Sequence, residues 1–451
     1  MATNDMMTSQ RPDSVTHSKD APLSRFLRGA SWVFAGTVIA QAINIAGTLL
    51  VARFIGKLAF GQFGMIQSTA LMFASIAGAG FGITATRFVS LYRSTNPDRA
   101  GRVLGMLTFT TACTGVLFAV ALLTCSSSLA QHAFNASGLS TALSLGSLYV
   151  AFVTMNGFQL GALAGLEAFK ESAFGSMVQA AFNAICVVLF AHLWGLYGAI
   201  VALNLSGLAG YLLLHKILAD ACRKRGINIT YHSAWKEYSA FVSFGLPAAV
   251  AGIVGNIAIW GCYAITANAS NGFKELGAIS AANNLRQAIL FVPGIVNRVM
   301  LPINCNQHGR RQPIREIILR QFYFTVIFAI IAALIMIVAA PYALRLSGKE
   351  FAGDNYVVIL FLCVAVLEVA AASLGQVLVI RSRMWLQAAN MALWGIVLFC
   401  VSFALMHSYR PAIAVGDGYL AAWIISIILY GICTYKLLSS KQSESLACEV
   451  L

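Results

Sequence analysis

The sequence is poor in charged residues. Asp, Glu, Lys and Arg make up 10% of its 451 residues, whereas hydrophobic residues make up 59%. A soluble domain carries about 25% charged residues, so a chain with so few cannot cover a water-exposed surface. The mean hydropathy of +0.77 indicates that the lipid bilayer is the solvent of this chain.

The sequence also lacks the patterns of common enzyme and metal sites. Its ten cysteines include no pair at Cys-x-x-Cys spacing, and most lie inside apolar runs. This placement favours small apolar packing roles over disulfides or metal ligation. No glycine-rich loop ends in Lys-Ser or Lys-Thr, and no cluster of His, Cys and carboxylates has metal-ligand spacing. We therefore expect no catalytic residues, no metal and no cofactor.

Long apolar runs are abundant, and twelve of them are long enough to cross a hydrocarbon core of roughly 30 Å as helices. They predict an all-α membrane protein with about twelve transmembrane helices. The predicted spans are residues 30–52, 64–86, 103–125, 143–166, 173–193, 195–217, 240–262, 276–300, 322–343, 355–379, 385–406 and 416–436.

The net charge of +14 comes from 30 Lys and Arg against 16 Asp and Glu. The basic residues are spread between the apolar runs, which argues against nucleic-acid binding and for the positive-inside rule. With both termini in the cytoplasm, the cytoplasmic segments hold 23 Lys and Arg and the outside loops hold six. One miscounted span would invert every later loop, so this bias supports both the span count and the orientation.

The two halves of the chain resemble each other at a regular offset. The segment that starts at Phe60-Gly61 opens the second span, and the segment that starts at Leu276-Gly277 opens the eighth, 216 positions later. A parallel repeat of six helices predicts two six-helix lobes around a central cavity with alternating access. The predicted order is a disordered cytoplasmic tail, an N-terminal lobe, a cytoplasmic linker, a C-terminal lobe and a second cytoplasmic tail, at residues 1–28, 29–218, 219–238, 239–437 and 438–451.

Two charged residues stand near the middle of predicted spans. Arg286 lies ten residues into the eighth span, about 15 Å deep at 1.5 Å per residue, and Glu368 lies near the centre of the tenth. Such a charge costs roughly 2.5–3.5 kcal/mol on insertion scales, so it has a function or a partner. In one interpretation Arg286 binds an anionic substrate group and Glu368 is a proton- or cation-responsive coupling residue. In the other, the two form a structural ion pair.

Polar residues recur on single faces of several predicted helices. In the first span, Gln41, Asn44 and Thr48 follow spacings of three and four, which is one helical face. Amides beside aromatic rings suit the hydroxyls and apolar faces of sugars, whereas the alternative is hydrogen bonding between helices. Together with Arg286, the candidate cavity residues are Gln41, Asn44, Gln179, Asn183, Asn256, Trp260, Asn283, Gln287 and Asn390.

Several packing motifs resemble those of a known family. They are Gly29-Ala30-Ser31-Trp32, Val51-Ala52-Arg53-Phe54-Ile55-Gly56, Phe60-Gly61-Gln62-Phe63-Gly64, Phe81-Gly82-Ile83-Thr84-Ala85-Thr86-Arg87-Phe88-Val89-Ser90, Leu163-Ala164-Gly165-Leu166-Glu167-Ala168-Phe169 and Trp194-Gly195-Leu196-Tyr197-Gly198-Ala199. With them the chain resembles the polysaccharide (O-antigen type) flippases of the multidrug/oligosaccharidyl-lipid/polysaccharide exporter superfamily, most clearly in the first half.

This resemblance implies outward flipping of an undecaprenyl-pyrophosphate-linked oligosaccharide across a bacterial inner membrane, for O-antigen lipopolysaccharide, capsule or exopolysaccharide synthesis. It makes Arg286 a candidate partner of the pyrophosphate, because arginine suits phosphate oxygens. The implied partners are the lipid-linked oligosaccharide, the bilayer, and a polysaccharide polymerase with its chain-length machinery.

Three other functions compete with this one. A cation- or proton-coupled multidrug or metabolite exporter of the same superfamily depends on acidic residues in the membrane, which the first-half spans lack but Glu368 supplies. A lipid II flippase is expected to have fourteen helices rather than the twelve predicted here. A membrane polysaccharide polymerase or ligase is expected to carry a large outside loop, whereas the longest outside stretches, near 126–142 and 344–354, are short.

Overall fold

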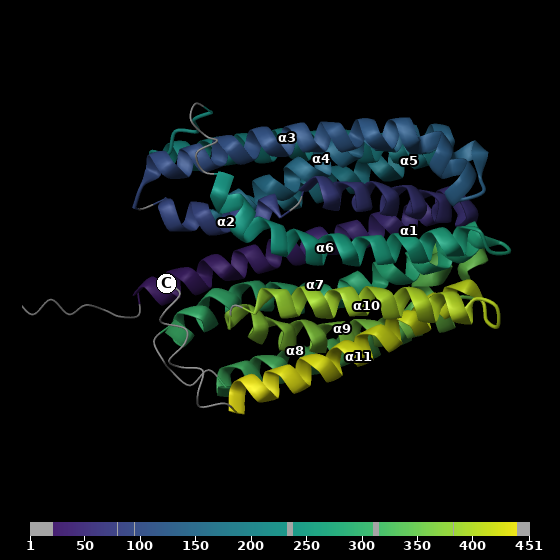
Figure 1. The fold of residues 1–451 in the computed structure, drawn as a ribbon. Coiled ribbons are helices and arrows are strands. Elements are labelled where there is room, and N and C mark those ends of the chain that lie inside the picture. The colour runs from purple at the N-terminus through teal and green to yellow at the C-terminus, as the bar shows by residue number, and fades with distance from the viewer. Residues whose placement is uncertain are drawn as a thin grey trace, which may run out of the picture.

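Helices joined by short connections make up the fold (Figure 1). The computed structural model describes residues 21–78, 80–93, 95–231, 238–309, 315–381 and 383–439, and no strand occurs among them. The main helices are α1 (Ala21–Gly78), α2 (Phe81–Tyr92), α3 (Pro97–Ser128), α4 (Ser140–Gly165), α5 (Phe169–Lys224), α6 (Tyr238–Ala267), α7 (Gly272–Gly309), α8 (Arg315–Ser347), α9 (Asn355–Ile380), α10 (Met384–Leu405) and α11 (Pro411–Ser439). Residues 1–20 and 440–451 of the predicted tails, and 232–237 of the predicted linker, lie outside the described residues.

Two of these helices reverse direction at a glycine. Gly56 in α1 has φ 77° and Gly195 in α5 has φ 58°, a left-handed conformation that is costly for any residue with a side chain. Eight helices of the described part are long and apolar enough to cross a membrane, α1 and α5 among them, and α6 adds the shorter apolar segment Gly252–Ala267. Counting the two arms of α1 and of α5 separately, with α6 and the more polar α7, gives the twelve passes predicted from the sequence.

The passes bring the start of α1 and the end of α11 to the same end of the bundle (Figure 1). We call this the terminus end. The opposite end, where α1 and α5 reverse, is the turn end. Large apolar side chains such as Ile185, Ile335 and Val338 are exposed on the outer faces of the helices. A hydrocarbon solvent favours this surface, and the chain is a multi-pass membrane protein.

The second predicted span, residues 64–86, is interrupted. Helix α1 ends at Gly78, and Gly80, with φ 74°, separates it from α2. Helix α2 packs against α4, where the Thr86 hydroxyl donates to the carbonyl oxygen of Gly161 at 2.8 Å. A hydropathy pattern does not register such a break, because glycine is apolar whether it continues a helix or ends one.

The N-terminal helices α1–α5 and the C-terminal helices α6–α11 meet along α1 and α7. A Cβ atom placed on Gly61 would lie 1.8 Å from the carbonyl oxygen of Phe273, and one placed on Gly277 would lie 2.3 Å from the carbonyl oxygen of Lys57. The two backbones are therefore in direct contact, which only small residues permit. Gly61 and Gly277 are the positions that the 216-residue offset relates, so the internal repeat puts its matching glycines on this contact. We call this contact the seam.

We expect Gly61→Ala to lower the thermal stability of the protein. The added methyl group collides with a backbone carbonyl, so the seam has to shift, at a cost of about 1–3 kcal/mol. The measurement is the midpoint of thermal unfolding in detergent. Gly431→Ala in α11 is the matched control, because a Cβ there would meet no atom within 4 Å. Equal midpoints for the two variants would contradict the close contact at the seam.

Candidate functional site

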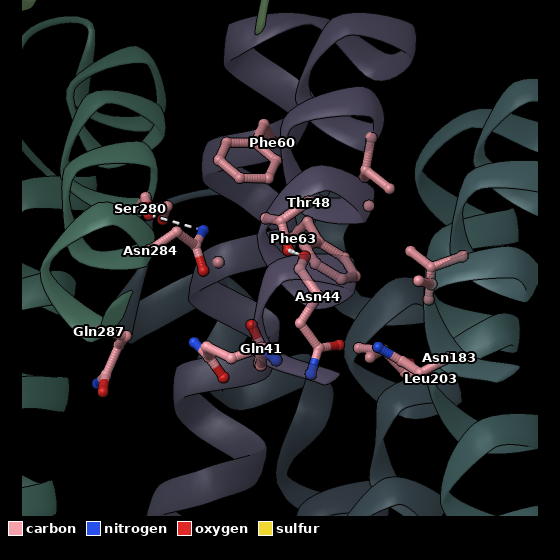
Figure 2. Close-up of a pocket in the computed structure, with 16 residues that line it drawn as sticks. Gln41, Asn44, Thr48, Phe60, Phe63, Asn183, Leu203, Ser280, Asn284 and Gln287 are labelled. Atoms are coloured by element: carbon pink, nitrogen blue, oxygen red, sulfur yellow. Dashed lines mark hydrogen bonds between the residues drawn. The ribbon is translucent and has the colours of Figure 1, made fainter. Parts of the chain in front are cut away.

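A cavity lies between the two halves of the protein (Figure 2). Both arms of α1, α5 and α7 form its walls, and its volume is about 390 Å³. This volume falls within the range of about 300–1,000 Å³ that is typical of small-molecule sites. Since α1 and α5 belong to the N-terminal half and α7 to the C-terminal half, the two halves share the cavity.

The N-terminal half contributes five neutral polar side chains to the wall. Gln41, Asn44 and Thr48 share one face of the first arm of α1, as their spacing predicts. Gln67 comes from the second arm of α1, and Asn183 comes from α5. The structure thus brings the predicted candidates Gln41, Asn44 and Asn183 to one cavity. Gln67 is not among the predicted candidates, and its only signal in the sequence is an amide inside an apolar run.

The C-terminal half contributes Ser280, Asn284 and Gln287. Their spacings of four and three put them on one face of α7, and Figure 2 shows them opposite the labelled residues of α1. Only Gln287 is a predicted candidate. The same helical spacing that identifies Gln41 and Asn44 could have identified Ser280 and Asn284, because it extends from Gln287 toward the start of α7.

Four of these amides are available to a ligand. The side chains of Gln41, Asn44, Asn183 and Gln287 remain accessible and make no hydrogen bond to another described residue. Asn284 instead donates to the carbonyl oxygen of Ser280 in its own helix, at 2.9 Å. A carboxamide both donates and accepts hydrogen bonds, so the four free groups can match hydroxyl groups in either direction.

The rest of the lining is uncharged as well. None of the described residues that line the cavity is acidic or basic. Its apolar part includes Phe60 and Phe63, whose rings are stacked with their centroids 6.4 Å apart. Both rings are buried within the wall, so the accessible groups are mainly the free amides, which suit a ligand that is rich in hydroxyls.

Arg286 and Glu368 form an ion pair within the C-terminal half. Arg286 Nη1 donates to Glu368 Oε2, and Arg286 Nε donates to Asn283 Oδ1 at 2.9 Å. The guanidinium lies 5.4 Å from the ring centroid of Tyr419, and Arg286 is 5% exposed. Arg286 precedes Gln287 by one residue, so its side chain leaves α7 about 100° away from the cavity face. The structure therefore joins the two predicted charges, with Asn283 as a third member, behind the cavity wall.

The remaining predicted candidates lie in other environments. Asn256 donates to the carbonyl oxygen of Gly252 in its own helix at 3.0 Å, and Trp260 Nε1 donates to the Thr69 hydroxyl at 3.1 Å. Trp260 thereby joins α6 to α1. The other two do not line the described cavity either: Gln179 packs its amide against the backbone of Gly210, and Asn390 is buried in the C-terminal half.

A second group of charges joins the two halves at the turn end. The Lys57 ammonium lies 2.5 Å from Asp354 Oδ2, and the Lys57 backbone N–H donates to Glu350 Oε2 at 3.0 Å. Arg410 bridges Asp354 and Glu275, with an N–O distance of 3.0 Å to each carboxylate. Lys57 and Asp354 are 8% and 1% exposed. We call these five residues the turn-end ion cluster.

Two cations meet three carboxylates in the turn-end ion cluster. Burial lowers the pKa of the Arg410 guanidinium, the hydrogen bonds to Glu275 and Asp354 raise it, and the net direction is upward. Arg410 therefore stays charged. From the sequence, Lys57 and Arg410 count only as outside-loop charges. Their pairing is missed because the partners are distant in the chain, since Glu350 follows Lys57 by 293 positions.

Comparisons with known proteins give one family and one fold. A family model described as "Polysaccharide biosynthesis protein" matches residues 26–306, more than half of the chain. No curated protein matches the sequence.

Among solved structures, an inward-facing multidrug resistance MATE family transporter of the MOP superfamily has a TM-score of 0.73 at 14% identity, covering 91% of this chain and 99% of that chain. An outward-facing structure of such a transporter has a TM-score of 0.68 at 14% identity, covering 91% and 95%. The lipid II flippase MurJ in an inward closed conformation has a TM-score of 0.66 at 13% identity, covering 90% and 91%. At these identities the likeness is one of fold.

We expect the ion pair of Arg286 and Glu368 to show strong coupling in a double-mutant cycle. Removal of one partner leaves the other charge buried and unpaired, which costs about 3–5 kcal/mol, whereas replacement of both by apolar residues of similar volume is close to neutral. Arg286→Met and Glu368→Met should each lower the midpoint of thermal unfolding, and the double variant should recover most of the loss. Simple addition of the two losses would show that the charges do not stabilise each other.

Proposed function

The chain belongs to the polysaccharide biosynthesis protein family, and from this membership we propose that it flips an undecaprenyl-pyrophosphate-linked oligosaccharide across a bacterial inner membrane. The product would enter O-antigen lipopolysaccharide, capsule or exopolysaccharide synthesis. The observation that supports this most directly is the shared cavity with its free amides. A sugar that leaves water for the membrane loses hydrogen bonds, and amides on the path replace them.

In this proposal the terminus end faces the cytoplasm. The bias of 23 against six Lys and Arg in the sequence supports that orientation. Residues 29–218 and 239–437 act as two lobes, with residues 219–238 as the cytoplasmic linker. The solved structures of similar fold are transporters and a flippase, which supports transport rather than catalysis. A polysaccharide polymerase and its chain-length machinery would take up the flipped product.

The turn-end ion cluster and the seam support alternating access. Both join the N-terminal half to the C-terminal half at the turn end, on the outer side of the cavity in this orientation. The headgroup enters from the cytoplasmic side while these contacts hold. It leaves after Lys57 separates from Asp354 and Glu350 and the two glycine backbones part. Buried ion pairs suit such a switch, because their attraction is large only while water is excluded.

Arg286 and Glu368 are the candidates for substrate charge and coupling. In the structure the Arg286 guanidinium is paired with the Glu368 carboxylate, so an anionic pyrophosphate has to compete with Glu368 for Arg286. Protonation of Glu368 removes its charge and frees Arg286 to bind phosphate oxygens, for which arginine is well suited. Proton binding and substrate binding are then linked through one side chain. Equal transport rates with and without a proton gradient would show that transport is not coupled to protons through Glu368.

Reconstituted protein should flip the lipid-linked oligosaccharide. In proteoliposomes that contain the lipid on both leaflets, the fraction of sugar accessible to a membrane-impermeant oxidase should rise from about half toward completion only when the protein is present. Arg286→Ala should insert, and the molecules that remain folded should lose at least about tenfold in rate, because the pyrophosphate loses its cationic partner. The unpaired Glu368 lowers the stability of this variant, so the rate is compared per folded molecule. A chromosomal Arg286→Ala strain should then lack the surface glycan.

Two results would count against the function. Normal surface glycan in the Arg286→Ala strain would exclude Arg286 as the pyrophosphate partner. Proteoliposomes that expel cationic dyes but leave the lipid-linked oligosaccharide in place would favour the multidrug exporter instead.

Loss of Lys57 should open the turn end. Spin labels at Arg53→Cys and Tyr409→Cys, in a cysteine-free background, report the distance between the two halves there. Pulsed dipolar spectroscopy in nanodiscs should show a shift to longer distances in Lys57→Gln, because Asp354 loses its ion-pair partner from the other half, while the backbone N–H of residue 57 can still donate to Glu350. Lys349→Gln is the matched control, since Lys349 is exposed at the same end. An unchanged distance distribution in Lys57→Gln would show that the cluster does not hold the turn end closed.

A further inference from the structure

The charge of the cavity wall restricts which sugars it can accept. Half of the 16 residues that line the cavity are neutral and polar, and none of the described ones carries a charge. The free amides of Gln41, Asn44 and Asn183 come from one half of the protein and that of Gln287 from the other. The sugars of a headgroup between α1, α5 and α7 therefore meet hydrogen-bonding groups on both sides and no counter-ion in the cavity wall.

The buried cations of the protein do not give the surroundings of the cavity a net positive charge. Among the described side chains, the buried basic residues are Lys57 and Arg286. Lys57 is paired with Asp354, and Arg286 with Glu368. Each buried cation is thus matched by a carboxylate, and neither is among the residues that line the cavity. The cavity has the electrostatics of a neutral site.

Hydroxyl and carboxylate groups behave differently in such a site. A sugar hydroxyl donates and accepts, and so does a carboxamide, so Gln41, Asn44, Asn183 and Gln287 can satisfy it in either role. A carboxylate only accepts, and it loses strong hydration without gaining an opposite charge. Phe60 and Phe63 are buried in the wall, at 2% and 6% exposure, and they pack behind the amides.

We propose that this cavity selects lipid-linked oligosaccharides whose sugars are uncharged, and that Gln41, Asn44, Asn183 and Gln287 set this preference over sugars that carry a carboxylate. The inference rests on the proposed function, since it names the class of headgroup that the flippase accepts. The pyrophosphate is common to all substrates of this kind and does not distinguish between them. The discrimination lies in the sugars.

The test uses two lipid-linked trisaccharides on the same undecaprenyl pyrophosphate, one with glucose and one with glucuronic acid at the same position. Initial flipping rates in proteoliposomes should favour the glucose lipid by roughly tenfold or more, because an unpaired carboxylate in the cavity is strongly disfavoured. Asn183→Lys should reduce or reverse this ratio by supplying a counter-ion. Asn183→Asp, which is nearly isosteric, should increase it. Gln131→Lys adds the same charge at the exposed turn end and should leave the ratio unchanged.

The outcomes distinguish the preference for uncharged sugars from the flippase function itself. Equal rates for the two lipids, or faster flipping of the glucuronic acid lipid, would overturn the preference and leave the flippase function intact. A failure to flip either lipid would overturn the proposed function itself. If the ratio responded equally to Asn183→Lys and Gln131→Lys, the charge of the cavity wall would not be the determinant. A thermal unfolding midpoint for each variant ensures that only folded protein is compared.

Discussion

The structure depends on one constraint, which is that a polar group in hydrocarbon needs a partner. The buried charged residues of the described part are Lys57, Arg286 and Asp354, and each has an oppositely charged neighbour. Four accessible neutral amides without a described partner, those of Gln41, Asn44, Asn183 and Gln287, lie instead on the shared cavity. The buried charges are thus paired where the helices pack, whereas free amides occur where water or a ligand can reach them. Some buried neutral groups of α10 and α11, such as the Trp394 and Trp423 N–H groups, also have no hydrogen-bond partner among the described residues.

The interface between the two halves has two parts, a close contact at the turn end and the wall of the shared cavity. At the turn end, glycines related by the internal repeat allow α1 and α7 to touch, and the turn-end ion cluster joins them. Beyond Gly61 and Gly277, Gly64 and Ser280 already line the cavity. The contact that can close one end and the wall that can bind a headgroup therefore follow each other along the same two helices. A movement that separates the halves would change both together.

Much of the fold follows from the sequence, because long apolar runs and the distribution of basic residues are local properties. The fifth and sixth predicted spans, 173–193 and 195–217, are separated only by Trp194, and α5 reverses at the next residue, Gly195. The break at Gly80 is not predicted, because it depends on a backbone conformation that hydropathy does not register.

The site is predictable only in part. Helical spacing places Gln41 and Asn44 on one face, and the structure has them on the cavity. The depth of Arg286 and Glu368 marks them as unusual, but their pairing joins positions 82 residues apart, and no local pattern in the sequence encodes it. The residue type of Trp260 suggests a place in the cavity, whereas its N–H is directed to Thr69 by the packing of α6 on α1. Contacts of this kind arise from tertiary structure.

A cryo-electron microscopy structure of the protein in nanodiscs, bound to a lipid-linked oligosaccharide with uncharged sugars, would show directly whether the shared cavity binds the sugars. We expect sugar density between α1, α5 and α7, within hydrogen-bond distance of Gln41, Asn44, Asn183 and Gln287. Sugar density on the outer surface of the bundle, with the cavity filled by lipid acyl chains, would contradict it.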